Sequence, residues 1–283
     1  MPNVRQSPLS LPEALLALRP ATPRLASVLV HAGLSSRSDR RVLAAAELAN
    51  TFGARLIGVS TPAARPLTSS ASGIENAAIE RLLETSGDRF VALSATVRGG
   101  FHWERVDASP VAALSAFGWA ADLILVDHEE PDPGQAWTEM DELLGGSGRP
   151  VLIRAEDRPL SAFDHIIVVW DESAACRRAT LAALPFLGRA EAITLLAPPR
   201  RRRREREEQL LEDARRGLLA RGLPVVVARL QEWSSPHVLV PHLQAADADL
   251  VVMGAVQEHA PWRGRGLASA IAAHLRGPVF VSG

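Results

Sequence analysis

The sequence has little that would support several common classes of function. Its 283 residues contain one cysteine, Cys176, which excludes an internal disulfide bond and a zinc site built from cysteines alone. The formal net charge is −1, so the whole chain lacks the positive field that attracts nucleic acid or anionic membranes. No apolar run approaches the roughly 18–20 residues that a membrane-spanning helix needs. These absences predict a cytoplasmic protein with no nucleic-acid and no membrane partner.

Motifs for catalysis and metal binding are missing as well. The sequence has no His-Glu-x-x-His, no paired cysteines, no Gly-x-Ser-x-Gly elbow and no Walker lysine after a glycine-rich loop. Ser173 has no basic residue beside it in the sequence, so it is expected to cap a helix. The arginines at 200–204 are followed closely by Glu205, Glu207 and Glu208, a pattern typical of an exposed helix with ion pairs. We therefore expect no enzyme and no metal site.

What the sequence does have is a regular alternation of apolar strands and helical stretches. Runs such as 166–170 are apolar throughout, which suits strands that are covered on both faces of a parallel sheet. The predicted strands are residues 27–31, 55–60, 101–106, 122–126, 151–154, 166–170, 192–196, 223–229, 249–253 and 279–281. The predicted helices lie within 36–52, 74–98, 110–119, 135–144, 173–187, 200–221, 236–246 and 267–275.

The order of elements occurs twice along the chain. Asp122 and Asp249 precede similar apolar strands, and Pro150 and Pro278 each introduce the strand that closes a half. A polar turn with Pro159 separates the halves. The predicted domains are an N-terminal extension at 1–24, a first domain at 25–157 and a second domain at 158–283. The extension is not expected to be a secretory signal, because a proline and a glutamate interrupt its apolar stretch.

The second half carries the residues by which the chain resembles a known family. Residues 168–173, Val-Val-Trp-Asp-Glu-Ser, and the Ala/Arg-rich segment 174–179 are similar to that family's first strand, acidic residue, serine and first helix. Residues 248–255, Ala-Asp-Leu-Val-Val-Met-Gly-Ala, are similar to its fourth strand, and 277–281, Gly-Pro-Val-Phe-Val, to its fifth. On these segments the chain resembles the tandem universal stress proteins (UspA-like) over nearly all of residues 25–283.

This resemblance implies a particular fold. Each half is expected to be a doubly wound, Rossmann-like α/β domain of the adenine nucleotide α-hydrolase type, with a parallel five-stranded sheet in the order 3-2-1-4-5. The two fifth strands are expected to pair antiparallel inside the chain. In such sheets ligands bind beyond the carboxyl ends of the strands, where the strand order reverses.

The resemblance also points to candidate site residues. In nucleotide-binding members, strand four is followed by Gly, two residues, Gly, nine residues and Gly-Ser/Thr, whose backbone amides hold the phosphates. Here Gln257 stands at the second glycine position, and Arg265 with Gly266 stands near the third. Two arginines and two glycines before a helix favour an anion at that place. The candidate nucleotide-binding residues are Asp171, Glu172, Ser173, Met253, Gly254, Ala255, Arg263, Arg265 and Gly266.

The first half departs further from the pattern. Gly33 stands where the acidic residue after strand one belongs, and Asp127 stands where the glycine after strand four belongs. A carboxylate at that position is unfavourable for phosphate. The resemblance therefore implies a degenerate first domain that does not bind ATP.

Three functions are compatible with these residues. The first is a non-enzymatic universal stress protein of the stress response, with no cofactor, that acts by binding partner proteins or a small ligand, as a monomer or a homodimer. The alternative is an ATP/ADP-binding sensor that uses the second domain only. The third is a hydrolase or transferase on the same scaffold, which the missing nucleophile–base pair disfavours. The fold alone does not choose among them.

Overall fold

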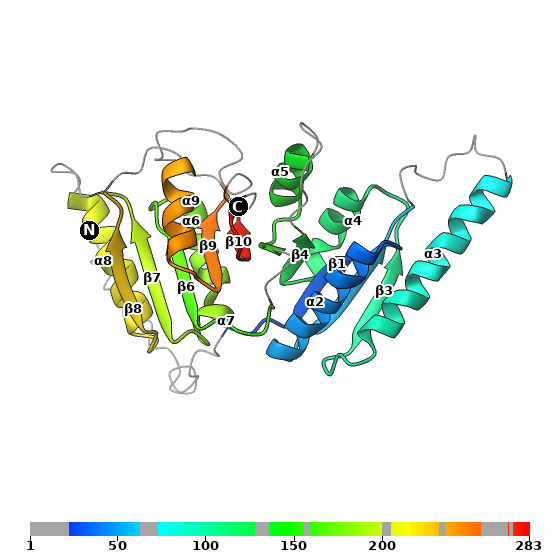
Figure 1. Ribbon diagram of the computed structural model, residues 1–283, viewed down its shortest axis with the longest axis horizontal. Coiled ribbons are helices and arrows are strands. Elements are labelled where there is room, and N and C mark those ends of the chain that lie inside the picture. The colour runs from blue at the N-terminus through cyan, green and yellow to red at the C-terminus, as the bar shows by residue number, and fades with distance from the viewer. Residues whose placement is uncertain are drawn as a thin grey trace, which may run out of the picture.

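The computed structural model describes residues 23–62, 73–127, 136–154, 159–199, 205–231, 236–255, 271 and 274–283. Within these ranges the chain forms a single ten-stranded sheet that is covered by helices on both faces (Figure 1). The two halves lie side by side, and β10 at the end of the second half pairs with β5 at the end of the first.

The described part of the first half contains five strands and five helical segments. The strands are β1 (Ser27–His31), β2 (Arg55–Ser60), β3 (Phe101–Arg105), β4 (Leu123–Asp127) and β5 (Val151–Arg154). The helices are α2 (Ser36–Phe52), α3 (Gly73–Ser94), α4 (Pro110–Phe117), the short 3-10 helix η1 (Gly118–Ala120) and α5 (Ala136–Gly146).

The second half repeats this order. Its strands are β6 (His165–Val169), β7 (Ala192–Ala197), β8 (Val225–Arg229), β9 (Leu250–Gly254) and β10 (Val279–Ser282). Its helices are α6 (Ala174–Ala182), α7 (Leu184–Leu187), α8 (Glu205–Leu219) and α9 (Pro236–Ala245). The predicted extension at 1–24, the arginine run 200–204 and most of the predicted helix 267–275 lie outside the described residues.

The strand order along the sheet is β3-β2-β1-β4-β5-β10-β9-β6-β7-β8. Each half therefore has the order 3-2-1-4-5 with parallel neighbours, as the resemblance implied. The expected antiparallel pairing of the fifth strands is also observed, with Val151 opposite Val281 and Ile153 opposite Val279. The two five-stranded sheets are thus continuous.

Local sequence signals explain where the helices begin and end. The Ser35 hydroxyl accepts a hydrogen bond from the Ser38 amide at 3.1 Å and caps α2, and Ser109 and Ser173 cap α4 and α6 in the same way. Gly53 ends α2 with φ of 66°, a left-handed conformation that glycine adopts without strain.

The helix predicted over residues 173–187 is in fact two helices, α6 and α7. Pro185 lies in the first turn of α7, where it has no amide hydrogen to continue the hydrogen-bond ladder of α6. Elsewhere the observed ends differ from the predicted ones by a few residues. The largest of these differences at a described helix or strand end is in α3, which ends at Ser94 and not near residue 98. Strand β8 begins at Val225, after Pro224.

Two apolar cores lie on the two faces of the sheet. One contains buried residues of α2, α3, α6, α7 and α8, and the other contains buried residues of α4, α5 and α9. Both cores run through both halves. On the first face the halves meet at a cluster of phenylalanines in which the Phe186 ring lies 4.7 Å from Phe52, 5.0 Å from Phe163 and 5.6 Å from Phe280 between ring centroids.

Candidate functional site

The carboxyl edge of the second half brings the described candidate residues together. Asp171 follows the end of β6, and Gly254 ends β9, the strand that pairs with β6. This is the point at which the strand order reverses, so it is the expected ligand-binding position for an open α/β sheet. Arg263, Arg265 and Gly266 lie outside the described residues.

Asp171 is buried and holds the start of α6. Its Oδ1 accepts hydrogen bonds from the Ser173 amide at 3.1 Å and from the Ser173 hydroxyl at 2.7 Å. The same hydroxyl accepts from the Cys176 amide at 2.9 Å. The expectation that Ser173 caps a helix is confirmed, and its hydroxyl is committed to a carboxylate and an amide.

Glu172 is held in an unusual backbone conformation between these two residues. Its φ is 65°, in the left-handed region that residues with a side chain rarely adopt. Its carbonyl accepts a hydrogen bond from Arg177 Nη1 at 2.8 Å. The turn after β6 is therefore fixed by contacts from both sides.

Gly254 is required by packing, whatever else it does. A Cβ atom at this position would lie 2.6 Å from the Cys176 amide nitrogen and 2.9 Å from atoms of Ala175, because the start of α6 lies directly against the end of β9. Met253 is fully buried in the core, and the Ala255 amide donates to the Ser282 carbonyl at 2.8 Å. The described part of this edge is thus close-packed.

Cys176 is a core residue. Its side chain is fully buried, and the Sγ–H donates to the Val169 carbonyl at 3.4 Å. Burial, with a further contribution from the Asp171 carboxylate, raises the pKa of the thiol to about 12. The thiolate is the nucleophilic form, so this cysteine is chemically inert near neutral pH.

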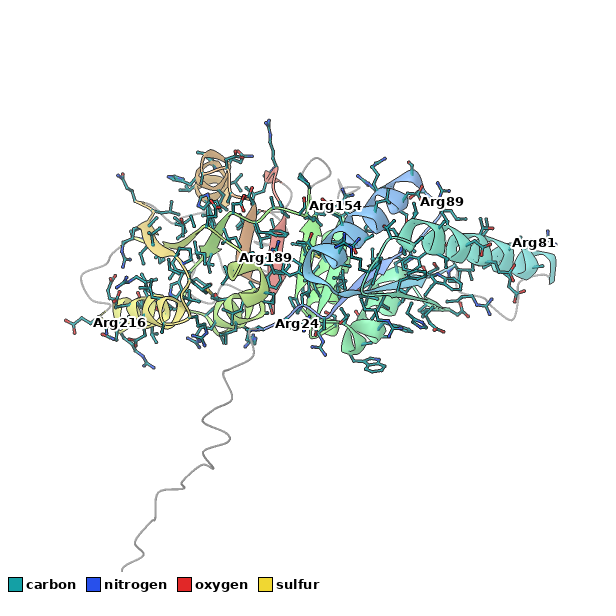
Figure 2. All side chains as sticks on the ribbon, turned by 90° about the horizontal axis from the view of Figure 1, so that it is seen from below. Arg24, Arg81, Arg89, Arg154, Arg189 and Arg216 are labelled. Atoms are coloured by element: carbon teal, nitrogen blue, oxygen red, sulfur yellow. The ribbon has the colours of Figure 1, made fainter. Side chains whose placement is uncertain are left out.

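In the first half, an ionic network occupies the equivalent edge. Asp127 ends β4 at the position that Gly254 has in β9. The residue is buried, with only 4% of its surface exposed. It accepts hydrogen bonds from Arg41 Nη1 at 3.0 Å and from Arg154 Nε at 2.8 Å. Figure 2 shows Arg154 on β5, where the first half meets the second.

Sequence reasoning identified Asp127 but missed its two partners. Arg154 stands inside a predicted buried strand, which is a signal that it needs a carboxylate. Arg41 has no such signal, because it lies in a helix among many charged and small residues. Its Nε and Nη2 also donate to the His31 carbonyl at 3.1 and 3.0 Å, so Arg41 links β1, β4 and α2.

His31 is a titratable group beside this network. Its Nε2 lies 2.9 Å from the Thr61 hydroxyl oxygen. Burial, and then the charge of Arg41, lower the pKa of the imidazole from 6.5 to about 4. The ring is therefore neutral in the folded protein at neutral pH.

The neutral His31 should make the fold sensitive to acid. The folded pKa of about 4 lies below the unfolded value of 6.5, so the unfolded chain binds this proton more readily. The free energy of unfolding should then fall as the pH is lowered from about 6.5 to about 4, by on the order of 2–3 kcal/mol from this group. Urea unfolding of the wild type and His31→Asn at pH 7.5 and about 4.5 measures it. An equal acid slope in both proteins would contradict the assignment.

The charged helix α8 matches its expected role as a solvated surface. Glu212 accepts from Arg215 at 2.8 Å and from Arg216 at 2.9 Å, and Glu208 accepts from Arg229 at 2.6 Å. These three arginines are therefore each paired with a carboxylate, whereas the arginine run 200–204 lies outside the described residues.

Among the described residues, no group of three or more His, Cys, Asp or Glu side chains is arranged to hold a metal ion. In the same residues, no helix has both the length and the apolar character needed to cross a membrane.

Several solved structures share this fold over most of the chain. A universal stress protein from Archaeoglobus fulgidus DSM 4304 matches with a TM-score of 0.68 and 15% identity, covering 92% of this chain and 96% of that one. A universal stress protein from Pseudomonas aeruginosa UCBPP-PA14 matches with a TM-score of 0.52 and 17% identity, covering 91% and 93%. A protein of unknown function from Pseudomonas aeruginosa PAO1 has a TM-score of 0.52 and 16% identity, covering 91% and 92%.

These likenesses extend over both halves of the chain. The fold is therefore that of the universal stress proteins, with two such units in one polypeptide. No protein-family model and no curated protein matches the sequence.

Proposed function

We propose that this chain is a tandem universal stress protein that acts in the stress response by binding a partner protein or a small ligand, and not by catalysis. The observation that carries the proposal is the buried network of Arg41, Asp127 and Arg154 at the carboxyl edge of the first half. Asp127, which stands where the resemblance locates the glycine after strand four, is paired with two arginines of the same chain.

A nucleotide phosphate in the first half would have to displace this network. If either arginine moves away from Asp127, the buried carboxylate loses one of its two positively charged partners. Breaking a buried ion pair costs about 3–5 kcal/mol. The Gly33 amide, at the turn after β1, already donates to the Ser38 hydroxyl at 2.6 Å. The Gly33 amide and the two arginines, which could otherwise bind an anion, thus already make hydrogen bonds within the fold.

The second half supports the alternative function, an ATP/ADP sensor. It keeps an acidic residue, Asp171, after its first strand and a glycine, Gly254, at the end of its fourth. Against this, Asp171 is occupied with Ser173, and Gln257 departs from the glycine pattern. We therefore place the sensor second.

The chemistry of the described residues supports a protein that does not catalyse a reaction. Ser173 donates to Asp171 and caps α6, so its hydroxyl is not presented to a base. Cys176 is buried with a raised pKa. Neither side chain therefore supports the enzyme hypothesis.

Titration with nucleotide separates the two leading functions. We expect no change in melting temperature when the purified chain is mixed with millimolar ATP or ADP. If the second half binds nucleotide, an excess of a hundredfold over the dissociation constant should stabilise the fold by about 2.7 kcal/mol and raise the melting temperature. Such a shift would overturn the first proposal in favour of the sensor.

Asp171→Asn is the matched variant for that titration. The amide oxygen of asparagine can still accept from the Ser173 amide, so the cap of α6 is retained while the charge is removed. A nucleotide-dependent shift that survives in this variant would exclude Asp171 from the site. Gly254→Val is unsuitable, because its side chain would strike the backbone of α6.

Partner proteins and a homodimer remain part of the proposal. The pairing of β5 with β10 uses both fifth-strand edges inside the chain, so a homodimer would form through another surface. We place the protein in the cytoplasm on the basis of its single, buried cysteine.

A further inference from the structure

A pocket of about 310 Å³ opens at the amino-terminal edge of the second half, at the other end of the strands from Asp171 and Gly254. This volume is at the lower end of the range of about 300–1,000 Å³ for ligand pockets, so it suits a ligand the size of an amino acid. Its walls come from the end of α9, the start of β9 and the turn before β10, and they include Leu243, Gln244, Asp247, Ala248, Arg276 and Gly277.

The internal repeat shows what fills this corner in the first half. A β4 amide donates to the Pro150 carbonyl at 3.0 Å, and a β9 amide donates to the Pro278 carbonyl at 3.1 Å. The two prolines are therefore equivalent. The residue before each proline is then equivalent too, so Gly277 is the counterpart of Arg149.

The helix ends on the other wall correspond in the same way. The Gly118 carbonyl accepts from the Ala121 amide at 3.1 Å, and the Gln244 carbonyl accepts from the Asp247 amide at 3.2 Å. Gln244 therefore occupies the place of Gly118, at the carboxyl end of the helix that precedes strand four.

In the first half, an arginine side chain of the protein occupies the corner. Arg149 Nε donates to the Gly118 carbonyl at 3.0 Å, and its Nη2 donates to the Trp119 carbonyl at 3.2 Å. A Cβ placed on Gly118 would lie 3.5 Å from the Arg149 Cγ, so the side chain lies along this turn. Gly277 supplies no such side chain, and a pocket is left where the guanidinium would be.

We propose that this pocket binds a small molecule with a guanidinium at one end and a carboxylate at the other, of the kind represented by free L-arginine. The guanidinium takes the place of the Arg149 side chain, against the last carbonyls of α9. The negative end of the helix dipole favours a cation there. Asp247 and Arg276 also line the pocket, so a carboxylate is present for the guanidinium and a cation for the ligand's carboxylate.

Calorimetric titration of the full chain tests this inference with three probes. L-arginine should bind saturably. L-citrulline has a similar shape, but its side chain ends in a neutral urea group and not in a charged guanidinium. Agmatine has the guanidinium but no carboxylate. Each should bind at least about tenfold more weakly than L-arginine. Equal affinity for L-arginine and citrulline, or for L-arginine and agmatine, would overturn the proposed charge recognition.

Two variants locate the site. Gly277→Arg should restore the arrangement of the first half and abolish binding. The backbone at Gly277 does not require glycine, although a Cβ there would lie 3.2 Å from the Ala248 carbonyl oxygen, so the melting temperature of this variant must be compared with that of the wild type.

Asp247→Asn should weaken binding about tenfold without straining the fold, because asparagine tolerates the positive φ of 45° at this position.

The matched variant in the first half is Arg149→Gly, which should leave the affinity of the second-half site unchanged. By the same argument it opens the corresponding corner of the first half to L-arginine, but more weakly, because Gly148 stands there at the place of Arg276. Absence of saturable binding by the wild type at millimolar L-arginine would refute the inference. Unchanged binding by both Gly277→Arg and Asp247→Asn would do the same. The nucleotide titration concerns the opposite edge of the sheet, so neither result depends on the proposed function.

Discussion

Replacing Asp127 with alanine should lower the free energy of unfolding by about 3–5 kcal/mol. The substitution leaves Arg41 and Arg154 in the first half without the carboxylate that both contact, and the Arg154 side chain is almost fully buried. A buried charge that loses its partner is among the most destabilising changes that a single substitution can make. Urea unfolding of the wild type and the variant measures the difference.

The control for this experiment removes the whole network. A triple variant with Arg41→Met, Asp127→Leu and Arg154→Met should recover most of the lost stability, because apolar side chains of similar size can replace a buried ionic cluster. A loss below about 1 kcal/mol for Asp127→Ala would instead be the size of an exposed ion pair. In that case the network would be solvated, and the main support for an occupied first-half site would be lost.

Replacing Phe186 with alanine should cost about 3–5 kcal/mol and should also weaken the connection between the halves. Phe186 is fully buried, and its ring contacts Phe52 of the first half as well as Phe163 and Phe280 of the second. The Arg189 guanidinium lies 5.4 Å from the Phe52 ring centroid (Arg189 is labelled in Figure 2). Calorimetry should show the unfolding of this variant broadening or separating into two transitions.

Phe90→Ala is the matched control, because Phe90 is equally buried and its ring pairs with Phe101 of the first half. It should lose a similar amount of stability through its cavity. If both variants unfold with the same number of transitions, the phenylalanine cluster does not couple the halves, and the β5–β10 pairing alone would hold them together.

The fold could be predicted from the sequence because its signals are local and repeated. Asp122 shows this well. Its Oδ2 accepts from the Ala26 and Ser27 amides at 2.8 and 3.0 Å, and Asp249 makes the same contacts with the amides at the start of β6. The recurrence of an aspartate before strand four therefore has a physical cause, since it ties strand four to the beginning of strand one.

The site could be predicted only in part, because its contacts are long-range. Arg41 and Asp127 are 86 residues apart in the chain, and nothing near Arg41 in the sequence indicates that it turns inward. The role of Gly254 was also wider than its motif suggested, since the approach of α6 requires a glycine there with or without a ligand. Packing can thus require a motif residue whether or not the motif binds a ligand.

The junction of the halves also determines the order in which this protein can assemble. Strand β5 leaves the ribosome long before β10, with the whole second half still to be synthesised between them. At elongation rates of about 5–20 residues per second, the delay is on the order of ten seconds. During that time the β5 edge is an unpaired strand in a nearly complete nascent domain, and such edges are sites of aggregation. When β10 pairs with β5 late in synthesis, it therefore covers a strand edge that could otherwise pair with other chains.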